Sequence, residues 1–206
     1  MELIERTDCP FCWKVRLALA VYSIPYVSTP TTLSEKHPKV LQHNPKASVP
    51  VLIDADNVLW ESTVMLEYLN DQYADGALYA GTAAERARTR SLVAYSDGVV
   101  GPALRDLVFE RRSKPADQCD PQVIAKGLEN WGRVQHELDA MLGDRDYFGK
   151  GFSAADCALL ARLGVAEAYA AGPSSAVVHL RAWFDRLRQH EAWSMAYPSS
   201  FIRPST

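Results

Sequence analysis

The chain has 206 residues, with 48% hydrophobic and 23% charged side chains, a composition typical of a globular protein with one large or two small domains. Its 22 Lys and Arg against 25 Asp and Glu give a net charge of −3, which offers no reason to expect a nucleic acid or an anionic membrane as partner. The longest uninterrupted apolar run, residues 17–22, is far shorter than the ~20 residues of a membrane span. The first residues lack the basic start and apolar stretch of a secretory signal, so we expect a soluble, cytoplasmic protein.

Four cysteines are too few for a disulfide framework in a chain of this length, and they favour a reducing compartment. Cys9 and Cys12 form a C-x-x-C pair, whereas Cys119 and Cys157 stand alone. A structural zinc site would need two further ligands at close spacing, and the sequence has neither a second such pair nor an H-x₃₋₅-H motif. We therefore expect no metal site.

The first eighty residues predict a mixed α and β domain. A short apolar run at residues 3–6 is followed by Pro10, which fits the first position of a helix. Residues 26–29 are β-branched and aromatic, which is typical of a strand. Residues 51–53 and 58–60 flank a turn-rich tetrapeptide and indicate an antiparallel hairpin, and Ser62 then opens a helix. The predicted order is β-α-β, a connecting stretch, then β-β-α.

From residue 82 onward the sequence predicts helices alone. Thr82 and Glu85 form a capping box, and Ser153 with Asp156 forms a second one. Gly101-Pro102 predicts a kink or break in the first of these helices. Two more helices are expected, one that begins after Asp120 and runs towards Leu142, and one over about residues 175–189.

Two domains of unlike class follow from this pattern. We assign residues 1–75 to an α/β domain, residues 76–82 to a linker, and residues 83–206 to an all-helical domain.

Cys9 falls between a strand and a helix, at or beside the helix N-cap. Free backbone N–H groups and the positive end of the helix dipole stabilise a thiolate there, so we expect the pKa of Cys9 to lie below its usual ~8.5. Cys12 is one turn further on, close enough for a reversible disulfide with Cys9 if the backbone allows it. The alternative is that these are two unreactive thiols that fall three residues apart.

Three separated motifs resemble those of known proteins. The segment Cys9-Pro10-Phe11-Cys12 after a strand is similar to the active-site segment of glutaredoxins. Residues 44–52, with Glu61-Ser62 opening a helix, resemble the glutathione-binding half of the cytosolic glutathione transferases, and residues 152–156 resemble the capping segment of that family's helical domain. The chain looks closest to the cysteine-type classes, especially the omega-like thiol transferases. The resemblance implies a thioredoxin-like N-terminal domain before the helical one.

The resemblance also implies roles for four residues in glutathione binding. Val49 would bond the cysteinyl backbone of glutathione like an added strand, with Pro50 in the cis form. Glu61 would pair with the ligand's amino group, and Ser62 would receive the γ-glutamyl carboxylate at a helix N-terminus. Taken alone, Val49-Pro50 also reads as an ordinary extended dipeptide, Glu61 as a solvated acid and Ser62 as a helix cap.

Two more residues take a role from the same resemblance. Lys36 matches the position of a lysine that contacts the glycyl end of glutathione, or it is an exposed lysine in a polar loop. Phe11 would back onto the thiol and line the pocket, or belong to the core. Omega-like members commonly have a single cysteine, so Cys12 is either a resolving thiol or a buried bystander.

The function implied is glutathione-dependent thiol transfer or reduction, such as deglutathionylation or dehydroascorbate-type reduction. Cys9 would carry the glutathionyl group as a mixed disulfide, with glutathione as co-substrate, no metal, and a small electrophile or disulfide as second substrate. Two alternatives stay open: conjugation or lyase chemistry on an electrophile, and a non-enzymatic interaction module like the stringent-starvation-type regulators. The resemblance further implies a homodimer.

Overall fold

The structure is a computed structural model that describes residues 1–32 and 34–201. It divides into two compact units, one formed by Met1–Leu78 together with the segment that begins at His190, the other by Tyr79–Gln189. The division expected from the sequence assigned the residues after 189 to the helical domain. Residues 190–201 group instead with the first unit because their aromatic side chains pack on its first helix, α1 (Pro10–Val21).

The first unit is built on a four-stranded sheet with the order β2-β1-β3-β4. Strands β1 (Glu2–Glu5) and β2 (Val27–Pro30) are parallel, and β3 (Val51–Asp54) is antiparallel to β1 and to β4 (Asn57–Trp60). The predicted hairpin is confirmed, with Asp54 opposite Asn57 across a two-residue turn. This is the thioredoxin-like arrangement that the sequence predicted.

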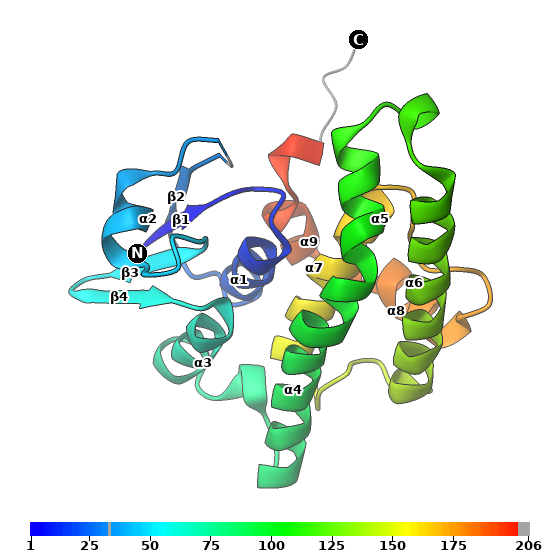
Figure 1. Cartoon of the computed structure of the whole chain (residues 1–206). Coiled ribbons are helices and arrows are strands. Elements are labelled where there is room, and N and C mark those ends of the chain that lie inside the picture. Colours follow the sequence, from blue (N-terminus) through cyan, green and yellow to red (C-terminus); the bar gives the residue numbers. More distant parts are fainter. Residues whose placement is uncertain (33, 202–206) are drawn as a thin grey trace. The chain divides into compact units, whose positions relative to one another are not determined.

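Helices cover both faces of this sheet (Figure 1). Helices α1 (Pro10–Val21) and α3 (Ser62–Gln72) pack against each other on one side. On the other side, Val40 of α2 (Pro38–His43) packs on Ile4 of β1 and Val51 of β3. Helix α2 lies in the stretch that the sequence left as a connection, since six residues with a single buried side chain give no periodic signal.

A buried ion pair anchors α1 to the sheet. Arg16 of α1 binds the Glu5 carboxylate through Nη1, and the two side chains are only 5% and 1% exposed. The same guanidinium donates to the Thr7 carbonyl at 2.7 Å and to the Ala196 carbonyl at 3.1 Å. Arg16 thereby connects the end of β1, the loop that leads to Cys9, and the C-terminal segment.

The C-terminal segment of the first unit is held by aromatic packing. Helix α9 (Glu191–Ala196) places the Trp193 ring centroid 5.0 Å from that of the fully buried Trp13. The rings of Tyr197 and Phe201 lie 5.6 Å and 6.1 Å from the same tryptophan. Aromatic pairs in this range add to the free energy gained by burial.

The second unit is helical, as the sequence predicted. Its helices are α4 (Ala83–Tyr95), α5 (Gly101–Ser113), α6 (Pro121–Leu142), α7 (Ala154–Ala168) and α8 (Val178–Leu187). The break expected at Gly101-Pro102 takes the form of a π-helical turn, Ser96–Val100, directly before α5. Both predicted capping boxes are present, and residues 154–166 of α7 are all buried. Helix α7 is therefore the core of this unit.

Asp156 connects the elements around the start of α7. Its fully buried carboxylate accepts hydrogen bonds from the backbone N–H groups of Phe148 and Ser153, both at 2.9 Å, and from Trp183 Nε1 at 3.0 Å. The Ser153 hydroxyl donates to it at 2.6 Å. Burial raises the pKa of this carboxyl, and the bonds from Ser153, Phe148 and Trp183 act in the opposite direction.

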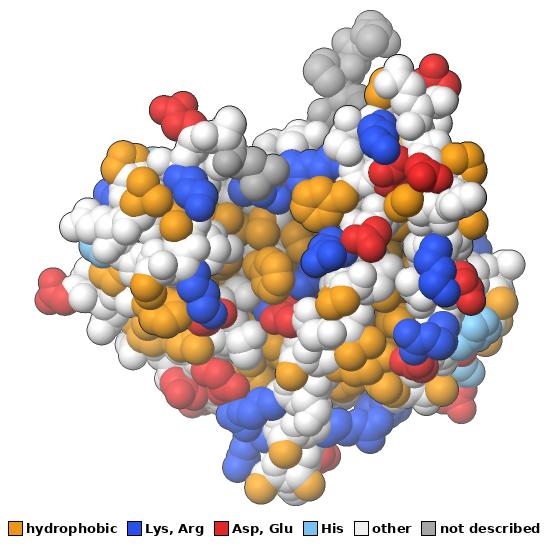
Figure 2. Space-filling view, viewed as in Figure 1, with side chains coloured by type: hydrophobic (Ala, Val, Ile, Leu, Met, Phe, Trp, Pro, Cys, Tyr) orange, Lys and Arg blue, Asp and Glu red, His pale blue; other side chains and the backbone are white. Residues whose placement is uncertain are grey.

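The surface carries charges of both signs, and they are interspersed on the face shown in Figure 2. Among the described residues, we find no helix that combines the length and the apolar character needed to cross a membrane.

Replacement of Asp156 tests this anchoring. We expect Asp156→Ala to lower the free energy of unfolding by about 3 kcal/mol or more, because several buried donors lose their acceptor at once. Urea denaturation followed by tryptophan fluorescence measures the change. Asp146→Ala is the matched control, since that side chain is 81% exposed and its loss should cost little. Equal losses in both variants would contradict the role given to Asp156.

Candidate active site

Cys9 is the N-cap of α1. Its backbone is extended, at φ −80° and ψ 122°, and Pro10 occupies the first position of the helix as predicted. The Cys9 carbonyl accepts the first helical hydrogen bond, from the Trp13 N–H at 2.9 Å. The sequence leads to this geometry because proline favours the first turn of a helix and the strand β1 ends only four residues earlier.

The surroundings of Cys9 favour its thiolate. A hydrogen bond from the Cys12 side chain is the largest cause, and with the N–H groups of Cys12 and Phe11 and the charge of Arg6 it lowers the pKa of Cys9 to about 6, against the opposing effect of burial. A thiol with that pKa is about nine-tenths ionised at pH 7. Cys9 is 6% exposed, so the thiolate still reaches the surface.

Cys12 has the opposite character. It is fully buried, and burial together with the adjacent Cys9 raises its pKa well above the usual value. The Cys12 thiol therefore keeps its proton and donates a hydrogen bond to the Cys9 sulfur. Two titratable groups with pKa values pushed apart in this way are typical of an active site.

Arg6 and Asp8 flank the thiol from the preceding loop. Arg6 Nε lies 2.5 Å from Asp8 Oδ1, and the two side chains are 19% and 11% exposed. The carboxylate next to Cys9 is thus paired with a cation, which limits its effect on the thiolate. The sequence left the direction of the Asp8 side chain open.

Cys9 opens into a cavity of about 400 Å³ within the first unit. Four of the eight predicted site residues line it: Cys9, Phe11, Lys36 and Val49. Cys12 and Pro50 are buried. The other lining residues come from α2 and from the loops that follow β1, β2 and α2. They are Arg6, Thr31, Thr32, Val40, Lys46, Ala47 and Ser48.

The loop before β3 is shaped by a buried asparagine. Asn44 Nδ2 donates to the Ser48 carbonyl at 2.7 Å, and Asn44 Oδ1 accepts from the Lys46 N–H at 2.9 Å. The Val49-Pro50 peptide bond is cis, as predicted. Within the described residues, the backbone N–H and C=O of Val49 make no hydrogen bond, so both are available at the cavity wall.

Glu61 and Ser62 begin helix α3. Glu61 is the N-cap with φ 73° and ψ 107°, outside the usual regions for a residue with a side chain, and such conformations are often found at ligand sites. Ser62 is the first helical residue and is buried. The Glu61 carboxylate lies 2.5 Å from Lys46 Nζ, and Lys46 lines the cavity. Glu61 therefore borders the cavity without lining it.

Sequence reasoning missed two cations of this site. Arg6 contributes to the low pKa of Cys9, and Lys46 pairs with Glu61. The position of Arg6 three residues before the C-x-x-C pair was a visible signal, because the loop between strand and helix is short. Nothing in the local sequence relates Lys46 to Glu61, which follows it by fifteen residues.

Metal ligands do not assemble in the described part of the chain: no three His, Cys, Asp or Glu side chains lie close enough together to hold an ion.

Comparison with known proteins agrees with this geometry. Residues 8–72 match the family described as glutathione S-transferase, N-terminal domain. The chain is 26% identical over 196 residues to a maleylacetoacetate isomerase of Pseudomonas aeruginosa, a match that covers 91% of each chain. It is 29% identical over 169 residues to glutathione S-transferase 3 of Zea mays, covering 79% of this chain and 76% of the relative.

A solved structure shows the same fold. The theta class glutathione S-transferase of Xanthomonas axonopodis pv. citri, determined with glutathione bound, superposes with a TM-score of 0.85 at 26% identity and covers 98% of both chains. The family match over residues 8–72, the relatives and the solved structure together show that this chain is similar to enzymes of the cytosolic glutathione S-transferase superfamily over most of its length.

The hydrogen bond between the two thiols is directly testable. Alkylation of Cys9 by iodoacetamide should rise with pH around a pKa of about 6, because only the thiolate reacts. In Cys12→Ala the donor is lost, and we expect that pKa to move upward.

Cys12→Ser is the matched control, since its hydroxyl keeps a donor and should leave the pKa lower than alanine does. An unchanged pKa in Cys12→Ala would show that Cys12 does not stabilise the thiolate.

Proposed function

We propose that this chain is a glutathione-dependent thiol transferase that acts through a mixed disulfide on Cys9. The observation that carries the proposal is the Cys9 thiol itself, which combines a lowered pKa with access to a cavity at a helix start. In a transferase that conjugates glutathione, the hydroxyl of a tyrosine or serine at this position would activate the thiol of glutathione. A cysteine thiolate at the same position is itself a nucleophile.

The reaction proceeds in two exchanges. The Cys9 thiolate attacks the glutathionyl sulfur of a mixed disulfide, a Cys9–S–S–glutathione bond forms, and the substrate leaves as a thiolate. A second glutathione thiolate then attacks the glutathionyl sulfur on Cys9. Oxidised glutathione leaves, and Cys9 returns as a thiolate. The low pKa of Cys9 also makes it a good leaving group in this second step.

The peptide part of glutathione has matching groups around the cavity. The unpaired backbone of Val49, next to cis-Pro50, would pair with the cysteinyl residue like an added strand. Ser62 at the start of α3 offers backbone N–H groups and a hydroxyl to the γ-glutamyl carboxylate, and Glu61 would bind the amino group. Lys36 would pair with the glycyl carboxylate, and Phe11 forms the wall beside the thiol.

Cys12 supports the first exchange as a hydrogen-bond donor. Its burial and raised pKa make it a poor nucleophile, so we assign the release of product to a second glutathione rather than to Cys12.

Conjugation or isomerisation of an electrophile is the second candidate. It is supported by the names of two relatives, a maleylacetoacetate isomerase and a glutathione S-transferase. A rapid reaction with an aryl halide and slow reduction of disulfides would favour it.

A homodimer is also part of the proposal. Helix α3 and the residue that ends it expose two large apolar side chains, Val64 at 49% and Tyr73 at 41%, which a second copy would cover.

Substitution of the nucleophile is the decisive experiment. We expect Cys9→Ser to abolish glutathione-dependent reduction of a small mixed disulfide, and Cys12→Ser to retain most of it. The assay follows NADPH oxidation coupled to glutathione reductase. Full activity in Cys9→Ser would show that Cys9 is not the nucleophile. If the wild type binds glutathione but does not reduce the disulfide, conjugation of an electrophile becomes the favoured function. If the wild type does not bind glutathione, a non-enzymatic interaction module becomes the favoured function.

The γ-glutamyl site can be tested separately. We expect Glu61→Gln to raise the dissociation constant of glutathione by about tenfold, because the ligand's ammonium group loses a charged partner. Isothermal titration calorimetry measures it. Asp56→Asn, at the exposed turn between β3 and β4, is the matched control and should bind as the wild type does. Equal affinity in both variants would contradict the position given to the ligand.

A further inference from the structure

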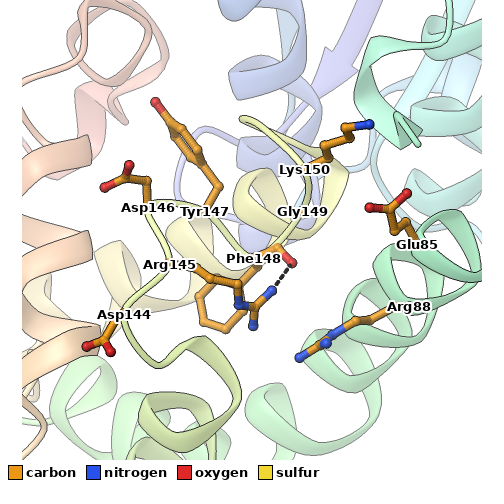
Figure 3. A pocket seen from close by; sticks show the side chains of 9 residues that line it. All are labelled: Glu85, Arg88, Asp144, Arg145, Asp146, Tyr147, Phe148, Gly149 and Lys150. Carbon is orange, nitrogen blue, oxygen red and sulfur yellow. Dashed lines mark hydrogen bonds between the residues drawn. The ribbon is translucent and has the colours of Figure 1, made fainter. Parts of the chain in front are cut away.

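The second unit contains a larger cavity, of about 610 Å³, between the first turns of α4 and the loop that joins α6 to α7. Figure 3 shows the charged side chains around it. This cavity lies wholly within residues 85–150 and shares no lining residue with the cavity at Cys9.

Two arginines meet on one side of this cavity. Arg88 Nη2 donates to the Met141 carbonyl at 3.3 Å, and Arg145 Nη2 donates to the same oxygen. The two guanidinium groups point toward each other in Figure 3. Arg145 is fixed further by bonds from Nε to the Leu142 carbonyl at 3.0 Å and from Nη1 to the Phe148 carbonyl at 3.2 Å. One shared oxygen thus brings two full positive charges together.

The carboxylates near the cavity are engaged elsewhere. Asp144 and Asp146 are 99% and 81% exposed, and their carboxylates turn away from the arginines toward His179 and Arg186. The Glu85 carboxylate accepts the Thr82 N–H at 2.6 Å in its capping box; this bond is the main cause that lowers the pKa of Glu85, and the charge of Lys150 adds a smaller effect. The negative charge of Glu85 and the positive charge of Lys150 therefore add no net charge to the cavity.

An excess of positive charge remains at Arg88 and Arg145. The end of α6 supplies about half a negative charge against two positive ones. Burial, followed by the charge of Arg88, lowers the pKa of Arg145, and the buried Asp156 carboxylate acts in the opposite direction. A guanidinium has five N–H donors, and within the described residues Arg145 uses three of its nitrogens once each while Arg88 uses one.

We propose that this cavity binds a small molecule through an oxyanion, a phosphate or carboxylate group, held between Arg88 and Arg145. Planar guanidinium groups match such oxygens with pairs of parallel hydrogen bonds. The cavity is larger than the oxyanion itself, and a volume of several hundred Å³ is typical of sites for small organic ligands. This is a second site, separate from the glutathione site and independent of the proposed function.

Titration of the intact protein with inorganic phosphate tests the proposal, by isothermal titration calorimetry in a zwitterionic buffer of low ionic strength. We expect saturable binding with a dissociation constant below about 10 mM, weakened about tenfold or more in Arg88→Gln. Arg86→Gln is the matched control, because Arg86 lies on the same helix and does not line the cavity, and among the described residues it bonds only the Gly81 carbonyl. A parallel titration with succinate distinguishes a phosphate from a carboxylate ligand.

Arg88 is exposed, and Arg145 is left intact because it caps the end of α6, so both variants should fold. Thermal unfolding without phosphate verifies this. Saturable binding that is weakened about tenfold or more in Arg88→Gln and unchanged in Arg86→Gln supports the site. No saturable binding of either phosphate or succinate by the wild type, or equal losses in Arg88→Gln and Arg86→Gln, overturns it. The affinity for glutathione should stay the same in both variants.

Discussion

The buried pair of Arg16 and Glu5 determines where the reactive cysteine lies. An unpaired charge at either position would be costly, so the two side chains fix helix α1 against strand β1. The Arg16 bond to the Thr7 carbonyl extends this constraint to the loop that ends at Cys9. The thiol is consequently positioned by the core of the unit rather than by the loop alone, and the start of α1 has little freedom to shift.

The thiols of Cys9 and Cys12 have opposite shifts in pKa, although the two side chains are identical. Cys9 stands at the helix terminus and reaches the cavity, whereas Cys12, one turn along, is enclosed by the core. The difference in burial keeps the proton on Cys12, and the retained proton stabilises the anion on Cys9. The cations Arg6 and Lys46 line the same cavity, and each is paired with a carboxylate, Arg6 with Asp8 and Lys46 with Glu61.

Local signals carried most of the prediction. Pro10 fixed the start of α1, the turn between Asp54 and Asn57 fixed the hairpin, and the capping boxes fixed two helices of the second unit. The sequence also placed Cys9, Phe11, Lys36 and Val49 in one site by resemblance, and these four line one cavity. The features that the sequence did not predict are of two kinds. Some are contacts between residues distant in sequence, such as the ion pair of Lys46 and Glu61, and others are segments too short to show a helical periodicity, such as α2.

The return of α9 to the first unit has a consequence for biosynthesis. Residues 190–201 leave the ribosome only after the whole helical unit, while the surface of α1 that they cover is made among the first twenty residues. Trp13 therefore stays uncovered during most of translation, and the thioredoxin-like unit reaches its final packing after its neighbour has been synthesised. A ribosome that stalls before residue 190 would release a chain with an exposed aromatic surface beside Cys9.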